Sequence, residues 1–338
     1  MQRLLADLIG RDPELEVAGI ASDPYEAREL VKSLRPDVMT LDVEMPRMDG
    51  LTFLERLMRL HPMPVVMVSS QTERDAEASL RALELGALDV IAKPRGSGSE
   101  GLTEFALSIA DSLRAAAKVD VGGRAPKAAP RARMLEGPAD RKLLEGQLIA
   151  IGASTGGTEA IREILACLPV DTPPIVIVQH MPETFTRMFA KRLDEQCQIA
   201  VHETVDRQRL EAGHAYVAPG NWHLAVRRSG KGFEAKVEQS PHVNRHRPSV
   251  DVLFDSVADC AGEAATAVIL TGMGSDGAAG TRRIKSAGGY TLAQDEASCV
   301  VFGMPKTAIQ TGCVDQIVPL GGMAERIMLR IREPRKST

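Results

Sequence analysis

Three residues with the side chains of a hydrolytic triad follow apolar segments in the second half of this 338-residue chain. Ser154 lies in the loop GASTGG (152–157) after the run LIAI, His180 follows PPIVIVQ, and Asp276 lies in a glycine-rich stretch after AATAVILT. A serine can attack a carbonyl carbon, a histidine can take the serine proton, and a carboxylate can orient the imidazole. If the three runs are parallel strands, these side chains end at the same edge of a sheet.

The loop GASTGG admits two interpretations. Gly152 and Gly156 would allow a sharp strand-to-helix turn that exposes the serine, with backbone N–H groups placed to stabilise negative charge. A small glycine-rich loop after a strand can also cradle a phosphate, so the loop alone does not decide between them. His180 favours the hydrolase, because a phosphate cradle does not need it. The order Ser, His, Asp differs from that of α/β-hydrolases, which predicts a different doubly wound fold.

A second set of reactive side chains follows apolar runs in the first third of the chain. Asp42 follows VMTL, Ser69 follows VVMV and Lys93 follows DVIA. At three neighbouring strand ends, the carboxylate could be phosphorylated, the hydroxyl could hydrogen-bond the phosphoryl group and the ammonium could neutralise it. Each residue alone would be an ordinary loop residue. Together they predict a phosphorylation site.

Alternating apolar runs and helical periodicity predict the elements that position both sets, in α/β architecture with parallel sheets. In the first part, strands are expected at 15–22, 36–44, 63–70 and 87–94, and helices at 24–34, 50–60, 74–85 and 103–117, the last with Thr103 as N-cap. In the second part, strands are expected at 147–152, 173–179, 264–271 and 289–294. The turn signals between 199 and 238 predict an antiparallel insertion or edge.

These patterns predict two domains, at 1–118 and 147–338, joined by a linker at 119–146. The linker is rich in Gly, Pro, Ala and Arg, and its solvated charge run is Arg124, Lys127, Arg131 and Arg133. A net charge of -4 speaks against general nucleic-acid binding. We expect no membrane insertion and no signal peptide, and the five scattered cysteines predict reduced thiols in a cytoplasmic protein.

With the string LDVEMPRMDG, residues 1–117 resemble a response-regulator receiver domain, which has a flavodoxin-like doubly wound fold. The resemblance makes Asp42 the phosphoryl acceptor, Ser69 the switch hydroxyl and Lys93 the lysine before a cis Pro94. It also implies Mg²⁺, bound by Asp42, by the backbone carbonyl of Glu44 and by an acidic pair at the end of the first receiver strand.

That first strand and its acidic pair have no counterpart in the sequence, which begins within the helix that should follow the strand. Asp7, Asp12 and Glu14 lie in or after this helix and are not expected to replace the pair. The metal site is therefore expected to be incomplete. Either the true start codon lies upstream or the receiver is impaired.

Residues 147–330 resemble the catalytic domain of chemotaxis protein-glutamate methylesterases. The matching strings are IGASTGGTEAIR, VIVQHMPETFTRMFAKRL, YVAPGNWHL, RPSVDVLFDSVA and ILTGMGSDGAAG. The resemblance makes Ser154 the nucleophile, His180 the base and Asp276 its orienting partner, with Thr155 and Met273 at the oxyanion site. It implies hydrolysis of glutamate methyl esters on chemoreceptors, deamidation of glutamines, and phosphorylation by a chemotaxis histidine kinase, with no cofactor for the esterase domain.

The sequence is also compatible in part with two other functions. A receiver-gated phosphate- or nucleotide-binding module would use GASTGG as its cradle. A DNA-binding response regulator would need a basic recognition helix after the linker, and the sequence has none. Five further histidines show no metal-binding spacing and are expected on loops or edges: His202, His214, His223, His242 and His246. Trp222 is expected to pack within the 199–238 segment.

Overall fold

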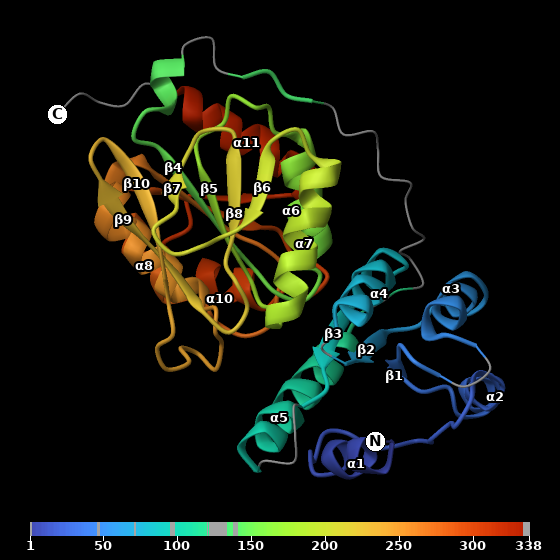
Figure 1. The fold of residues 1–338 in the computed structure, drawn as a ribbon. Coiled ribbons are helices and arrows are strands. Elements are labelled where there is room, and N and C mark those ends of the chain that lie inside the picture. The colour runs from blue at the N-terminus through green and yellow to red at the C-terminus, as the bar shows by residue number, and fades with distance from the viewer. Residues whose placement is uncertain are drawn as a thin grey trace. The chain divides into compact units, whose positions relative to one another are not determined.

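The structure is a computed structural model that describes residues 2–45, 48–70, 72–94, 99–119, 121, 134–137 and 141–333. The chain forms two compact units, Met1–Pro130 and Arg131–Thr338, each with its own arrangement of helices and strands (Figure 1). The four basic residues of the predicted charge run lie outside the described residues. None of the helices described is both long and apolar enough to cross a membrane.

The first unit contains a parallel three-stranded sheet in the order β1-β2-β3. Its strands are β1 (Met39–Asp42), β2 (Val65–Ser69) and β3 (Asp89–Ala92). Its helices are α1 (Gln2–Ile9), α2 (Pro24–Leu34), α3 (Gly50–Leu60), α4 (Glu73–Glu84) and α5 (Ser99–Ala116). The central strand β2 is buried along its whole length, which explains its unbroken apolar run. Three of the four predicted strands and all four predicted helices of this part are therefore present.

Three sequence-based expectations are wrong in this unit. Residues 15–22 form no strand, because an extended segment needs a paired neighbour, and the described sheet ends at β1 without pairing to them. Thr103 is not an N-cap, since α5 already begins at Ser99. The bond before Pro94 is trans, the isomer that X-Pro bonds intrinsically favour; among the described residues only Arg247–Pro248 is cis.

The second unit is built on a seven-stranded sheet in the order β13-β12-β11-β4-β5-β8-β6, and every pairing in it is parallel. The strands are β4 (Leu148–Ala153), β5 (Ile175–Gln179), β6 (Ala200–Glu203), β8 (His214–Val217), β11 (Ala265–Ile269), β12 (Tyr290–Gln294) and β13 (Gln316–Val318). After β4 the chain builds outward through β5, and it later returns to the other side of β4 at β11. This reversal is the topological switch point, where open parallel sheets hold their ligands.

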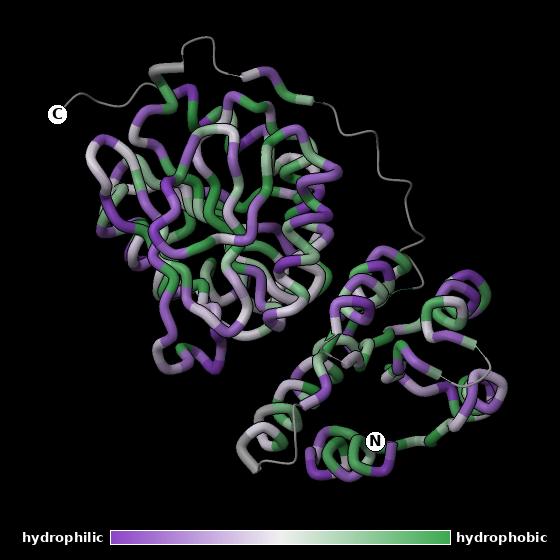
Figure 2. The backbone as a smooth tube through the Cα atoms, viewed as in Figure 1, coloured by the Kyte–Doolittle hydropathy of each residue, from purple (hydrophilic) through white to green (hydrophobic). Residues whose placement is uncertain are grey.

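Helices cover both faces of this sheet. They are α6 (Gly157–Cys167), α7 (Glu183–Gln196), α8 (Val250–Ala261), α9 (Ala278–Ser286), α10 (Met304–Gln310) and α11 (Leu320–Arg332). Alternate residues of β4 point to opposite faces. Leu148 and Ala150 join a core with Leu253 and Phe254 of α8, and Ile149 is also buried. Figure 2 shows hydrophobic backbone segments, in green, gathered in the interior of this unit. The predicted α/β class with a mostly parallel sheet is confirmed.

The segment 199–238 is partly an antiparallel insertion. Strands β7 (Arg209–Leu210), β9 (His223–Ser229) and β10 (Gly232–Glu238) form a separate antiparallel sheet in the order β7-β10-β9. Strands β6 and β8, from the same segment, join the edge of the parallel sheet instead. The short apolar pattern does not distinguish strands of the insertion from strands at the edge of the parallel sheet, because both kinds of strand share it.

Part of the predicted linker packs on the second unit. Leu135 N donates to the Cys167 carbonyl at 3.0 Å, and Arg332 donates to the carbonyl of Glu136. A 3₁₀ turn, η1 (Arg141–Leu144), precedes β4, and η2 (Gly262–Ala264) precedes β11. The second unit therefore includes ordered backbone ahead of its first strand.

Candidate active site

Ser154, His180 and Asp276 follow three adjacent strands of the parallel sheet. Ser154 comes directly after β4, and His180 comes directly after its neighbour β5. Asp276 lies in the loop after β11, the neighbour of β4 on the other side. Backbone hydrogen bonds hold the strand ends together, from Ser154 N to Thr271 O at 3.0 Å and from His180 N to Ala153 O at 3.1 Å. The predicted gathering of these residues at the carboxyl edge is confirmed.

The chain turns sharply from β4 into α6 at the serine. Gly156 has a φ of 78°, in the left-handed region that favours glycine, and a Cβ atom there would overlap Val300. Gly152 is needed for a different reason, since it lies in β4 and a Cβ would overlap Val250 of α8. Gly157 N donates to the Ser154 carbonyl at 2.7 Å and closes the turn. Gly156 thus permits the tight turn after Ser154, and Gly152 permits the close approach of α8 to β4.

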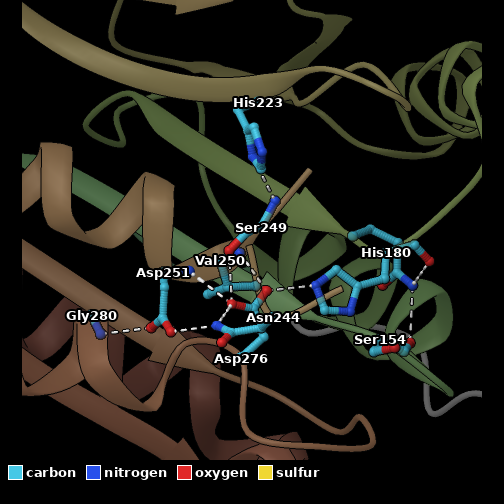
Figure 3. Close-up of polar contacts among 10 residues, drawn as sticks. Ser154, His180, His223, Asn244, Ser249, Val250, Asp251, Asp276 and Gly280 are labelled. Atoms are coloured by element: carbon cyan, nitrogen blue, oxygen red, sulfur yellow. Dashed lines mark hydrogen bonds and ion pairs between the residues drawn. The ribbon is translucent and has the colours of Figure 1, made fainter. Parts of the chain in front are cut away.

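His180 and Asp276 form a buried pair. Asp276 Oδ2 accepts a hydrogen bond from His180 Nε2 at 2.8 Å, and the two side chains are 7% and 1% exposed. In Figure 3, His180 lies between Asp276 and Ser154. Since the Asp276 carboxylate accepts the hydrogen bond, the ring proton of a neutral His180 lies on Nε2. The other ring nitrogen, Nδ1, then has a free lone pair. Nδ1 is buried and has no hydrogen-bond partner among the described residues.

Asp276 is held ionised by the groups around it. Burial opposes its charge, but the hydrogen bond and electrostatic attraction of His180, followed by hydrogen bonds from Asn244 and the Val250 backbone, lower its pKa well below the ordinary range. Oδ1 also accepts from the Ser249 hydroxyl at 2.8 Å and from Asp251 N at 3.2 Å. A carboxylate with this many donors keeps a fixed orientation. It can therefore hold the imidazole in one tautomer and stabilise its protonated form.

A chain of buried hydrogen bonds, which the sequence did not predict, links Asp276 through Ser249 to His223. His223 begins the edge strand β9, as expected, but its side chain is fully buried. Its Nε2 donates to the Pro241 carbonyl at 3.1 Å, and its Nδ1 accepts from Ser249 N at 3.2 Å (Figure 3). Burial lowers the pKa of His223, so it remains a neutral acceptor for Ser249. The one relevant feature of the sequence is Ser249, a residue type typical of an N-cap, which precedes the helical pattern at 250–261.

His246 lies on a loop, as expected, but this loop brings it into the site. Its ring stacks on that of His180, with centroids 3.7 Å apart and planes 11° from parallel. No spacing in the sequence signals this contact, because residues 180 and 246 are joined only by the fold. His202 and His214 do lie on strands β6 and β8 at the edge of the sheet, as expected, and bond each other at 2.9 Å.

The two residues predicted for an oxyanion site lie on the segments that flank the serine. Thr155 is buried, and its carbonyl accepts from the Thr271 hydroxyl at 3.0 Å. Met273 follows Gly272, where a Cβ would come within 2.7 Å of Ser154 Cβ. The backbone before Met273 therefore passes against the serine. The role of both residues in binding an oxyanion stays a prediction.

In the first unit, the structure brings Asp42 and Lys93 together. Lys93 Nζ lies 2.6 Å from Asp42 Oδ2, and Glu44 N donates to Asp42 Oδ1 at 3.1 Å. Ser69 ends the neighbouring strand β2, but its hydroxyl lies against the carbonyls of Ser70 and Asp75, at 3.3 and 3.4 Å. The carboxylate and ammonium are thus paired, and the hydroxyl bonds the loop after β2 and helix α4.

The described residues do not fit the Mg²⁺ site that the receiver resemblance implies. Mg²⁺ requires near-octahedral oxygen ligands, and Asp42 supplies one carboxylate that already bonds Lys93. Asp12 and Glu14 pair with Arg114 of α5 instead. No group of three or more His, Cys, Asp or Glu side chains suited to a metal occurs in the part of the chain that the structure describes.

Comparisons with known proteins agree with this division. Residues 149–327 match the family described as CheB methylesterase, and residues 1–100 match the response regulator receiver domain. A protein-glutamate methylesterase/protein-glutamine glutaminase of Cupriavidus pinatubonensis is 54% identical over 334 residues, which cover 98% of this chain and 93% of that protein. The protein of the same name from Salmonella typhimurium is 52% identical over 331 residues, covering 98% and 94%.

Among solved structures, the second unit is similar to the crystal structure of the Thermotoga maritima CheB methylesterase catalytic domain. The TM-score is 0.54 at 38% sequence identity, and the match covers 54% of this chain and 98% of that domain. The match extends over nearly the whole of the solved domain, so the parallel sheet and its flanking helices correspond as a unit.

Proposed function

The chain belongs to the CheB methylesterase family, and from that premise we propose that it hydrolyses glutamate methyl esters on chemoreceptors and deamidates glutamine side chains. The observation that carries the proposal is the buried His180–Asp276 pair, which leaves one imidazole nitrogen unpaired beside the strand end that bears Ser154. A phosphate cradle would need neither the pair nor the free nitrogen. The family membership likewise favours the hydrolase over a phosphate- or nucleotide-binding module.

In the proposed reaction, Ser154 Oγ bonds the ester carbonyl carbon while its proton passes to His180 Nδ1. Asp276 stabilises the imidazolium that forms, and the negative oxygen is stabilised by backbone N–H groups at Thr155 and Met273. When the ester C–O bond breaks, His180 returns the proton to the departing methanol. Water then attacks the acyl-enzyme, giving its proton to His180, and Ser154 is released with that proton. A primary amide follows the same path and releases ammonia.

The first unit supplies the regulatory input in this proposal. Asp42 is the phosphoryl acceptor, Lys93 neutralises the phosphoryl charge, and Ser69 turns from its present partners to bond it. The phosphoryl group comes from a chemotaxis histidine kinase. Because the described residues do not fit the implied Mg²⁺ site, the unchanged chain should take up phosphoryl groups from acetyl phosphate poorly or not at all, as measured by phosphate-affinity electrophoresis. Any phosphorylated species that does form should be absent from Asp42→Asn, and strong Mg²⁺-dependent phosphorylation of the unchanged chain would contradict this expectation.

We further propose that the protein works in the cytoplasm, where kinase and receptor signalling domains are accessible. None of the five cysteines, all of which lie among the described residues, is paired in a disulfide, which suits a reducing compartment.

The function is tested on a methylated cytoplasmic fragment of a chemoreceptor. Methanol release reports ester hydrolysis, and ammonia release from the unmodified fragment reports deamidation. The protein should give both products, and Ser154→Ala should give neither. Ser229→Ala, a matched change at an exposed serine that ends β9, should behave as the unchanged chain. Methanol release that persists in Ser154→Ala would contradict the proposal.

A further inference from the structure

Residues 243–246 form a tight turn beside the site. Val243 N donates to the His246 carbonyl at 3.1 Å, and His246 N donates back to Val243 at 2.9 Å. The two central residues, Asn244 and Arg245, both have positive φ, at 51° and 67°. Such a two-residue turn prefers asparagine at its first central position, which tolerates the left-handed region. The turn therefore fixes the directions in which Asn244 and His246 project.

Asn244 is placed between two carboxylates. Its Nδ2 donates to Asp276 Oδ1 at 2.7 Å and to Asp251 Oδ2 at 2.7 Å (Figure 3). Asp251 is anchored from the other side by Gly280 N at 2.7 Å, and burial raises its pKa. One amide group thus uses both hydrogens to hold Asp276 at a set distance from a second acid. Without it, the two carboxyl groups would share no donor side chain.

His246 restrains the other member of the pair. Its ring lies flat on His180, so it blocks one face of the imidazole and leaves the ring edges, where Nε2 and Nδ1 lie, available. Burial, with the neighbouring His180 charge second, lowers the pKa of His246 to about 3. A neutral ring in this position attracts the imidazolium that forms during catalysis through its π face. The groups that act electrostatically on His246 are His180, Asp276, His242 and Arg245.

We propose that the turn Val243–His246 is a positioning element of the active site, in which Asn244 fixes the Asp276 carboxylate and His246 fixes the plane of the His180 ring. We expect neither residue to touch the substrate. The proposal rests on the proposed function for its kinetic consequences, because it assigns the turn to the same Ser154, His180 and Asp276.

The His246 contact is tested with two variants of the full chain. For His246→Ala we expect kcat for methanol release to fall about tenfold, the value of a good ring–ring contact, with KM little changed. His246→Phe keeps a neutral stacked ring and should restore most of kcat. The acid limb of its pH profile should coincide with that of the unchanged chain, because His246 does not titrate in the assay range. His242→Ala, at an exposed histidine of the same loop, is the matched control and should keep both parameters.

Two results would overturn the role of His246. A His246→Phe variant as inactive as His246→Ala, with the acid limb displaced, would mean that His246 transfers protons itself. A His246→Ala variant with unchanged kcat would mean that stacking does not position the base.

Asn244 is tested in the same way. Asn244→Ala should lower kcat with little change in KM, since it frees a carboxylate that does not bind substrate. Unchanged kcat in this variant would remove Asn244 from the proposal.

A second measurement separates this proposal from the proposed function. The His180 Nε2 proton, buried against Asp276, should give a downfield proton signal that exchanges slowly with water. The signal should be sharp in the unchanged chain and in His246→Phe, and broadened in His246→Ala and Asn244→Ala, whether or not the protein hydrolyses esters. A signal of equal sharpness in all four proteins would overturn the positioning role even if methanol release is normal.

Discussion

Asp276 is an ionised carboxylate at a place from which water is nearly excluded. Its side chain is 1% exposed, and the donors around it come from the side chains of His180, Asn244 and Ser249 and from the backbone at 250 and 251. An asparagine at this position would keep the size of the side chain but lose its charge, and its amide N–H group would face hydrogen-bond donors. Asp276 therefore stabilises the fold in addition to its proposed catalytic role.

Asp276→Asn should lower activity strongly, and it should also lower the free energy of unfolding at pH 7 by about 2–3 kcal/mol, since an amide nitrogen replaces a buried acceptor. The pKa of Asp276 is lower in the folded chain than in the unfolded chain. Its stabilisation is thus present above about pH 4 and is lost as the pH falls further. The difference between the two proteins in urea unfolding should shrink on acidification. A difference that grows toward low pH would contradict the assignment.

The sequence predicts the residues that are proposed to be catalytic, but it does not predict the residues that hydrogen-bond or stack on them. Ser154, His180 and Asp276 each follow an apolar run, so their meeting could be deduced from strand ends. His246 and His223 lie in a loop and at the start of an edge strand, and no periodicity connects either to the site. Their roles depend on how β9 and the 240–249 loop pack beside β4, which only the folded chain shows.

At the scale of elements, the turn from β4 into α6 is the feature that presents the serine. Gly156 adopts a positive φ and has Val300 against it, so two separate constraints exclude a side chain. Gly312 has a similar φ of 71° but open space around it. Comparing substitutions at Gly156 and Gly312 therefore separates the effect of backbone strain from the effect of steric crowding.

Gly156→Ala should lower the free energy of unfolding by more than Gly312→Ala, which should cost about 1 kcal/mol from backbone strain alone. Only Gly156→Ala should also reduce methanol release, because the displaced turn moves Ser154. Thermal unfolding and the methanol assay measure both effects. Equal destabilisation by the two changes would show that Val300 yields easily and that the turn is not tightly constrained.

Most elements were predictable because their periodicity is strong. Helices α2 and α3 match their expected ranges, and the buried strands β2, β4 and β5 match long apolar runs. Residues 15–22 have the pattern of a strand but no neighbour to pair with, and pairing is a property of the sheet rather than of the segment. In the same way, β6 and β8 join the parallel sheet because its edge at β5 is available for pairing.

At the scale of the whole molecule, each unit has its own sheet and apolar core. The predicted boundary at 147 leaves out ordered residues that contact the second unit. Leu135 bonds the end of α6, and Glu136 bonds Arg332 of α11. Two fragments, 144–338 and 131–338, therefore test where the independent folding unit begins.

Both fragments should fold and release methanol, because the sheet and the site lie within 148–318. The longer fragment should be more stable by about 1–2 kcal/mol, the contribution of two hydrogen bonds, and should melt at a higher temperature. Circular dichroism and gel filtration would check the fold. An aggregated 144–338 fragment, or equal melting temperatures, would contradict the boundaries.

The most direct test of the central claim, that Ser154 and His180 act as one nucleophile–base unit, is a double-mutant comparison of methanol release from methylated receptor. Ser154→Ala and His180→Ala should each reduce kcat at least about a thousandfold, and the double variant should be no more than about threefold worse than either. Reductions that multiply in the double variant, or a Ser154→Ala protein that keeps its rate, would show that the ester is not cleaved by this pair.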